Sequence, residues 1–270
     1  MSINETAYAK INLALHVRAR RPDGYHELET LFAFVDSGDR LSVRAAAQDS
    51  LKVTGEFAST LDDPFGNIVM QALGILPRAG GLSVLLEKNL PVAAGLGGGS
   101  ADAGALFRAV RDMAGLPDDW QVRAARLGAD VPACVDSVTC IGRGTGTDLQ
   151  AVDSDLAGTP VLLVNPRLPL STGPVFAGWD GEDRGPLPDG TASQIASAGR
   201  NDLEASAIGL CPAIATVLSA LQETGAWLVR MSGSGATCFA LYEAVTGRDE
   251  AAAQIAAQQP GWWQLAGALR

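Results

Sequence analysis

A glycine-rich segment near the middle of the chain constrains its fold more than any other feature. Residues 91–102 read PVAAGLGGGSAD, and Ser100 stands at the start of a run whose apolar residues have helical spacing: Ala103, Leu106, Phe107 and Val110. Glycines allow close approach of the backbone, and the first N–H groups of a helix attract anions. The segment therefore predicts a cradle for phosphate.

Three familiar phosphate loops do not match this segment. A Walker A loop has a lysine before its Ser or Thr, but Ser100 directly follows Gly99. The dinucleotide fingerprint needs a third glycine where Ser100 stands, and a protein-kinase glycine loop lies between two strands with no helix after it. Taken alone, the segment also fits a glycine-rich surface loop capped by Ser100 and without a ligand.

Composition limits the classes of partner. The chain has 270 residues, 47% of them apolar and 19% charged, which indicates one large or two ordinary globular domains. A net charge of −10 argues against nucleic acid or an anionic membrane as partner. The start lacks the pattern of a signal peptide and no apolar run reaches about 18 residues, so we expect a soluble, cytoplasmic protein. The cysteines have no metal-ligand spacing and are expected to be buried, reduced thiols: Cys134, Cys140, Cys211 and Cys238.

Strands and helices alternate without simple βαβ repetition, which predicts an α+β fold. Residues 6–17 alternate as a half-buried strand, and further strands are expected at 26–35, 40–45, 81–87, 138–141 and 149–152. Helices are expected at 67–78, after Ser100, at 118–127 and from Asp130, with Pro132 in the first turn. A second half has strands at 161–164, 226–231 and 236–242, helices at 214–223 and 250–258, and a last strand. A boundary near residue 152 divides the chain into domains 1–152 and 153–270.

Lys10 and Asp130 are the candidate catalytic residues. Lys10 is one of only three lysines, and Asn12 shares its strand face. Phosphoryl transfer to an alcohol needs a carboxylate to orient the hydroxyl and a cation to offset charge. The alternatives are a lysine that extends to solvent from a sheet face and an aspartate that only caps a helix.

Two further motifs have polar or aromatic groups suited to a nucleotide. The turn Ser232-Gly233-Ser234-Gly235 offers a second set of N–H groups to phosphates, or is a plain hairpin connection. Tyr25-His26, after a Pro-Asp-Gly turn, pairs a stacking ring with a hydrogen-bonding imidazole, as a nucleobase requires. A structural histidine at the start of a strand is the alternative.

Together, these motifs resemble the three motifs of the GHMP kinase superfamily. The segments 9–13 (AKINL), 21–26 (RPDGYH), 128–132 (GADVP) and 201–204 (NDLE) are similar to those of the branch that acts on 4-diphosphocytidyl-2-C-methyl-D-erythritol in the non-mevalonate (MEP) isoprenoid pathway. The resemblance covers nearly the whole chain. It implies a ribosomal-protein-S5-like N-terminal domain and a ferredoxin-like C-terminal domain with the active site in the cleft between them.

The resemblance also implies roles for individual residues. ATP would phosphorylate the 2-hydroxyl of the substrate, with Asp130 as base, Lys10 as its electrostatic partner and Asn12 beside the erythritol. Tyr25 and Phe176 would sandwich the cytosine, His26 would bond its edge, and Thr172 would also contact the substrate. The ATP site would comprise Asn67 by the adenine, Pro91, Gly95, Gly97, Gly98, Gly99, Ser100 and Ala101, with Ser100 near Mg²⁺. The expected partners are these small molecules, and the expected state is a monomer or weak homodimer.

Two features depart from the family pattern or leave a choice open. Thr147 stands where the family often has glutamate, with Asp148 one residue later, and Trp179 competes with Phe176 as the stacking residue. The alternative functions are a kinase of homoserine or mevalonate, a silent nucleotide-binding protein and, more remotely, a Rossmann-type oxidoreductase. The Asp-Gly-Tyr-His motif argues against the first, since those acceptors carry no nucleobase.

Overall fold

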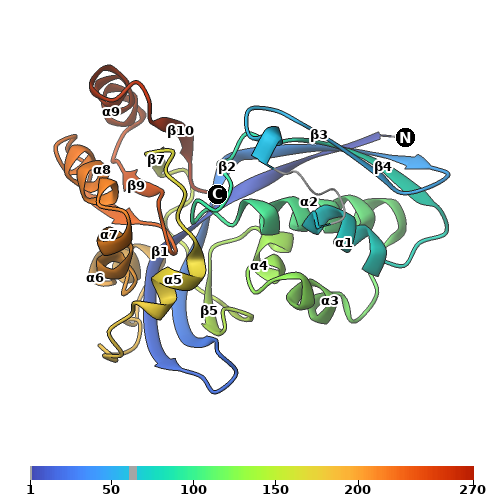
Figure 1. Ribbon diagram of the computed structural model, residues 1–270, viewed down its shortest axis with the longest axis horizontal. Helices are drawn as coiled ribbons and strands as arrows, with labels where there is room; N and C mark the ends of the chain where they lie inside the picture. The colour runs from blue at the N-terminus through green and yellow to red at the C-terminus, as the bar shows by residue number, and fades with distance from the viewer. Residues whose placement is uncertain (1, 61–65) are drawn as a thin grey trace. The chain divides into compact units, whose positions relative to one another are not determined.

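The computed structural model describes residues 2–60 and 66–270 and forms two compact units (Figure 1). The first unit contains Met1–Lys10, Ser37–Val92 and Gly97–Val138, and the second contains Ile11–Asp36, Ala93–Leu96 and Thr139–Arg270. Two long strands, β1 (Ser2–Arg20) and β2 (His26–Ala46), contribute to both units. The predicted boundary near residue 152 follows the order of the chain rather than these units, and it stays a prediction.

The first unit packs helices against a small sheet. The end of β2 pairs antiparallel with β4 (Gly81–Glu87), which pairs parallel with β3 (Ser50–Thr54), and a short 3₁₀ turn spans Ala58–Thr60. Helix α2 (Gly98–Ala114) packs on α1 (Ile68–Ile75) and α4 (Val131–Asp136), and α3 (Trp120–Leu127) lies beside α4 (Figure 1). The sequence predicts one apolar face for α2, but every residue from Ala101 to Val110 is buried. Small alanine and glycine side chains let neighbouring elements approach α2 on several sides.

Strand β1 is more deeply buried than its alternation predicts. All residues from Ala9 to Val17 are buried, including the polar Lys10, Asn12 and His16, so the prediction of a half-buried strand is wrong. The strands expected at 26–35 and 40–45 are one continuous strand. Gly38 interrupts the apolar pattern because β1 passes close by: a Cβ there would lie 1.9 Å from the carbonyl oxygen of Ala7.

The second unit contains an antiparallel sheet with the strand order β10-β7-β9-β8. Its strands are β7 (Pro160–Asn165), β8 (Leu228–Met231), β9 (Cys238–Leu241) and β10 (Trp263–Ala268). The start of β2 pairs with β5 (Cys140–Gly144), which pairs with β6 (Asp148–Ala151). The helices are α5 (Thr172–Ala177), α6 (Ala192–Ala198), α7 (Glu204–Leu210), α8 (Ala213–Gln222) and α9 (Val245–Gln258). Sequence patterns missed α5 to α7, because each spans only six or seven residues, about two turns, which is too short to show a helical period.

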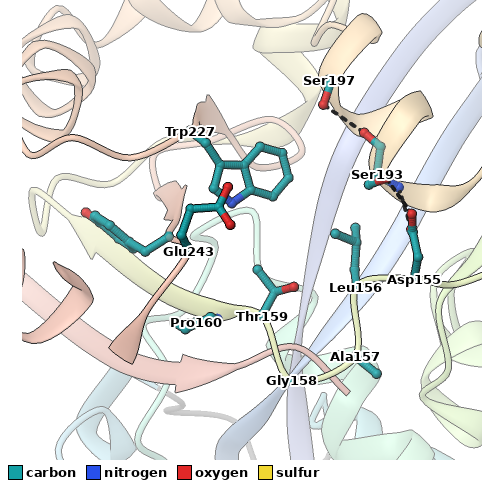
Figure 2. Close-up of a pocket in the computed structure, with 11 residues that line it drawn as sticks. Asp155, Leu156, Ala157, Gly158, Thr159, Pro160, Ser193, Ser197, Trp227 and Glu243 are labelled. Atoms are coloured by element: carbon teal, nitrogen blue, oxygen red, sulfur yellow. Dashed lines mark hydrogen bonds between the residues drawn. The ribbon is translucent and has the colours of Figure 1, made fainter. Parts of the chain in front are cut away.

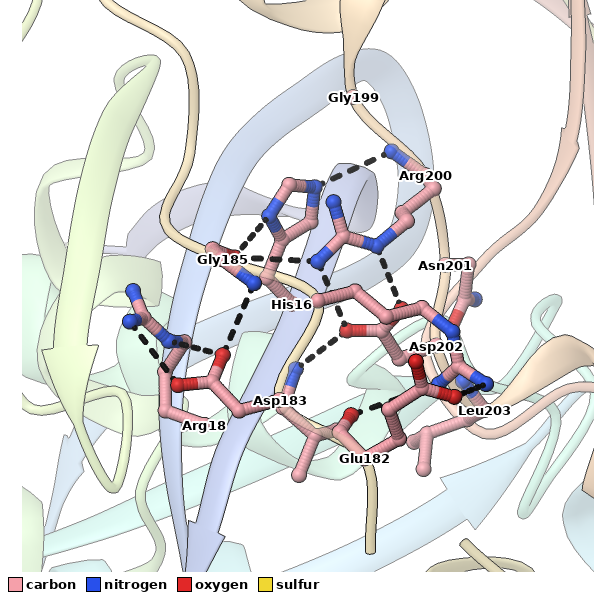
Figure 3. Close-up of polar contacts among 12 residues, drawn as sticks. His16, Arg18, Glu182, Asp183, Gly185, Gly199, Arg200, Asn201, Asp202 and Leu203 are labelled. Carbon is pink, nitrogen blue, oxygen red and sulfur yellow. Dashed lines mark hydrogen bonds and ion pairs between the residues drawn. The ribbon is translucent and has the colours of Figure 1, made fainter. Parts of the chain in front are cut away.

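The irregular segment 180–187 is held on β1 by a polar network (Figure 3). Arg18 makes two hydrogen bonds to Asp183, and His16 contacts the Gly185 carbonyl oxygen through Nδ1 at 3.2 Å. The Nε2 atom of His16 accepts the N–H of Arg200. A carbonyl only accepts and a backbone N–H only donates, so His16 is the neutral tautomer with its proton on Nδ1.

The free energy of unfolding is expected to fall as the pH drops below about 6.5. Burial lowers the pKa of His16 and Arg200 lowers it further, so the unfolded chain binds a proton that the folded chain excludes. Stability is therefore fully present above the unfolded pKa and decreases on acidification, by at most ~1.4 kcal/mol per pH unit for one proton. Urea unfolding at several pH values between 5 and 7.5 measures this slope, and His16→Gln is expected to reduce it. An unchanged slope in that variant would contradict the assignment to His16.

The cysteines are free and buried, as predicted: Cys134, Cys140, Cys211 and Cys238. Among the residues described, no helix has both the length and the apolar character to span a membrane.

Candidate active site

Lys10 and Asp130 form a close ion pair in the first unit. The Nζ of Lys10 lies 2.9 Å from Oδ2 of Asp130, and the lysine side chain is 5% exposed while that of Asp130 is 31% exposed. Asp130 occupies the N-cap position of α4, but its side chain makes no capping hydrogen bond. Both alternatives, a lysine in solvent and an aspartate that only caps, are therefore wrong. A partly exposed carboxylate stands beside a buried ammonium group.

The first turn of α2 lies against this pair. Gly97 is the N-cap residue, with φ of 59°, and a Cβ there would lie 2.9 Å from Cε of Lys10 and 3.5 Å from Oδ2 of Asp130. The first bond of the helix runs from the Ala101 N–H to the Gly97 carbonyl oxygen. The N–H groups of residues 98–100 consequently have no carbonyl one turn back, and they are available to an anion.

The helix begins two residues earlier than expected, at Gly98, so Ser100 lies inside its first turn and does not cap it. Ala101 is 1% exposed and its N–H is already bonded. Asn67 caps α1 by accepting the Val69 N–H at 2.9 Å, and Pro91 is buried. The predicted contacts of Asn67, Pro91 and Ala101 with ATP stay predictions.

A second cation, Lys88, lies buried in the same unit and was not predicted. Its ammonium group contacts the carboxylates of Asp39 and Asp102. Burial raises the pKa of Asp102 to about 8, although the Lys88 charge opposes this rise. The pKa of Lys88 is also raised: burial lowers it, but the two carboxylates together outweigh that effect. The available sequence signal was the scarcity of lysine together with the position of Lys88 three residues before Pro91.

In the second unit, the Ser232–Gly235 turn packs against Gly95 of the glycine-rich segment. The Ser232 hydroxyl donates to the Gly95 carbonyl oxygen at 2.8 Å and accepts the Asn12 N–H at 3.2 Å. Gly95 has φ of 76°, and a Cβ there would lie 2.3 Å from the carbonyl oxygen of Ser232. The turn and the glycine-rich segment thus contact each other at Gly95. The predicted role of the turn, to offer N–H groups to phosphates, stays a prediction.

Side chains also hold this turn in place. Asn201 donates to the carbonyl oxygens of Met231 and Gly233, both at 2.8 Å, and the Ser234 hydroxyl lies 3.0 Å from that of Thr172. Asn12 donates to Thr30 at 2.7 Å, so its amide is used within the unit. Asn201 belongs to the 201–204 motif, but the sequence alone indicated no role for it.

An aromatic cluster surrounds His26 in the second unit. Its ring lies 5.1 Å from that of Phe176 and 5.9 Å from that of Trp179, which it meets edge-on. Trp179 is 4% exposed and belongs to the core, whereas Phe176 is only partly buried and Tyr25 is 64% exposed. Burial lowers the pKa of His26, and Arg20 adds to that effect. His26 is therefore a neutral hydrogen-bonding group at pH 7.

A separate polar pocket of about 530 Å³ contains none of the predicted site residues (Figure 2). Trp227, Glu243 and Asp155 are among its lining residues. Asp155 lies at the start of α6, where it accepts hydrogen bonds from the Ser193 and Thr191 side chains and from the Ser193 N–H. The hydrogen bond from the Ser193 hydroxyl is the main cause that lowers the pKa of Asp155 to about 2. The Asp155 carboxylate is therefore a structural group.

Family models define the class of protein. The model of the GHMP kinase N-terminal domain matches residues 67–141, and that of the C-terminal domain matches residues 190–260. This class matches the α+β architecture, so the predicted fold class is confirmed. A solved homoserine kinase from Cytophaga hutchinsonii shares the fold alone, with a TM-score of 0.71 and 18% identity over 99% of this chain and 95% of that chain.

Full-length relatives define the family within this class. The 4-diphosphocytidyl-2-C-methyl-D-erythritol kinase of Novosphingobium aromaticivorans is 68% identical over all of this chain and 94% of its own length, and that of Brucella melitensis is 43% identical over 98% and 94%. A crystal structure of 4-(cytidine 5'-diphospho)-2C-methyl-D-erythritol kinase has a TM-score of 0.83 and 34% identity, covering 99% of each chain. The chain belongs to the 4-diphosphocytidyl-2-C-methyl-D-erythritol kinase family.

Proposed function

We propose that the chain transfers the γ-phosphoryl group of ATP to the 2-hydroxyl of 4-diphosphocytidyl-2-C-methyl-D-erythritol, a step of the non-mevalonate isoprenoid pathway. The observation that carries the chemistry is the Lys10–Asp130 pair, 2.9 Å apart and packed against Gly97 at the start of α2. Membership of the family, with a relative 68% identical over the full chain, supports this acceptor over homoserine or mevalonate.

The residues of the first unit suit an in-line transfer. Asp130 orients the acceptor hydroxyl and takes its proton. The acceptor oxygen bonds to the γ-phosphorus as the bond between that phosphorus and the β–γ bridging oxygen breaks. The leaving group is ADP. Lys10 offsets the negative charge beside Asp130. The N–H groups of residues 98–100 receive phosphate oxygens. A loose transition state does not require a strong base, so orientation by Asp130 suffices.

Magnesium would accompany ATP. The described residues contain no group of three or more His, Cys, Asp or Glu side chains suited to a metal. Mg²⁺ is commonly held by substrate phosphates, waters and one or two oxygen ligands from the protein. The Ser100 hydroxyl, in the first turn of α2, is an oxygen of this kind next to the N–H groups for phosphate, so the residues fit the ion. When bound, the ion neutralises phosphate charge.

The second unit offers groups for the cytidine end of the acceptor. The neutral His26 imidazole suits the hydrogen-bonding edge of cytosine, and the exposed Tyr25 ring suits stacking. Phe176 fits the opposite face better than Trp179, because Trp179 is committed to the core. Thr172 and Asn12 are proposed to contact the acceptor, and Ser232–Gly235 to support the phosphate loop through Gly95.

The remaining proposals concern the adenine and phosphate contacts of ATP, the location of the protein and its partners. Asn67 and Pro91 would lie by the adenine of ATP, and Ala101 by its phosphates. We propose a cytoplasmic monomer or weak homodimer that acts on small molecules and binds neither nucleic acid nor membrane.

Release of ADP from magnesium-ATP tests the function. We expect release with 4-diphosphocytidyl-2-C-methyl-D-erythritol and none above background with mevalonate or homoserine. Release with another alcohol would reject the assignment of the cytidine site, and ATP binding without release for any acceptor would indicate a silent nucleotide-binding protein.

A further inference from the structure

Lys88 is a buried cation that the proposed reaction does not use. It directly follows β4 and is 2% exposed, and its ammonium group contacts the carboxylates of Asp39 and Asp102. The distance from Nζ to Oδ2 of Asp102 is 2.9 Å, and both aspartates are almost fully buried. These three side chains, the Lys88 cluster, lie within the first unit.

Stability alone is a weak reason for such a cluster. Removing charges from water is costly, and apolar replacements of buried ion pairs are often neutral or stabilising. In addition, Oδ1 of Asp102 is buried and has no hydrogen-bond partner among the described residues. The positions of the segments that the cluster joins therefore indicate its role better than its contribution to stability does.

The cluster joins the two chain segments that flank the glycine-rich loop, which comprises residues 91–97 before α2. Asp39 accepts the N–H groups of Asn89, at 2.5 Å, and Leu90, at 2.7 Å, just before the loop begins. Asp102 lies one turn into α2, just after the loop ends. The ammonium group lies directly under the first residue of α2, because a Cβ on Gly98 would be 3.1 Å from Nζ of Lys88.

We propose that Lys88 is a positioning residue for the nucleotide. It clamps the start of α2 to the segment that enters the glycine-rich loop, so that the N–H groups of residues 98–100 keep the directions in which they receive phosphate. Its charge also offsets the negative charge of the cluster, which would otherwise repel phosphate near the helix start. This inference rests on the proposed function, because that function places ATP at α2.

Two substitutions at Asp102 distinguish the loss of its contact with Lys88 from a change in side-chain volume. Asp102→Leu keeps similar volume but cannot accept from Lys88, whereas Asp102→Asn keeps an accepting oxygen. We expect Asp102→Leu to weaken Mg-ADP binding and to raise KM for ATP by about tenfold or more, since small displacements of positioning groups have large effects. The KM of the acceptor is expected to stay unchanged, and Asp102→Asn is expected to restore most of the affinity.

Calorimetric titration with Mg-ADP measures this affinity without turnover, and Lys52→Met, at an exposed lysine of β3, is the matched control. A folded Asp102→Leu variant with wild-type affinity, or with an equal rise in the KM of the acceptor, would overturn the proposal. If that variant does not fold, hydrogen exchange of the wild-type chain tests the proposal instead. Mg-ADP is expected to slow amide exchange at residues 89–90 as well as at residues 98–100. Unchanged exchange at residues 89–90 would overturn the proposal. A wild-type chain that binds no Mg-ADP overturns the proposed function itself, and this inference with it.

Discussion

Replacing Asp130 by asparagine is expected to lower kcat by a factor of about 10² to 10⁴, the usual contribution of a positioned acid or base. The amide cannot take the proton of the acceptor hydroxyl, and it leaves the buried Lys10 ammonium group without its carboxylate partner. The KM for ATP is expected to change little, because the N–H groups at the start of α2 remain in place. Steady-state kinetics with both substrates varied would measure these effects.

A control for this variant lies at the other end of the same helix. Asp136 ends α4, and its side chain is 53% exposed and 3.8 Å from Arg111. Asp136→Asn is therefore expected to leave kcat unchanged. Lys10→Met is expected to be as damaging as Asp130→Asn, and the double variant no worse than either, because the two residues act as a unit. Wild-type turnover in either single variant would reject the catalytic assignment.

Replacing Gly104 by valine is expected to lower the free energy of unfolding by about 3 kcal/mol, at the upper end of the range for overpacked sites. Gly104 lies where α2 crosses α4, and a Cβ there would be 2.4 Å from the Cys134 carbonyl oxygen. Backbone atoms cannot move aside as a flexible side chain can, so the two helices must separate. Urea unfolding measures the loss.

Gly74 provides the matched comparison, because it is also helical but no atom of the described residues lies within 4 Å of an added Cβ. Gly74→Ala is expected to stabilise the chain by about 0.5–1 kcal/mol through helix propensity. Equal changes in the free energy of unfolding at the two positions would show that the close contact between α2 and α4 does not explain the need for glycine at position 104.

Local patterns predicted most elements of the fold. The helix after the glycine-rich loop, the short helix at Asp130 and the strands of the second sheet are confirmed with small shifts in their ends. The helices α5 to α7 were missed because short segments rich in Pro, Gly and small residues carry little periodicity. The continuity of β2 was missed because a glycine such as Gly38 is typical of a turn. In the structure, glycine is needed at this position because β1 passes close to it.

The sequence by itself determined that a helix follows the glycine-rich segment, the α+β class and the family, since each depends on residue types at fixed local spacing. The family resemblance implied that Lys10 is the electrostatic partner of Asp130. Only the tertiary structure decided that the two form a 2.9 Å ion pair and that the Asp130 side chain does not cap its helix, because 120 positions in the sequence separate the two residues. It alone placed Trp179 in the core and buried Lys88 between two aspartates. Burial and long-range pairing depend on which segments pack together, and the spacing of residues within one segment does not indicate its packing partners.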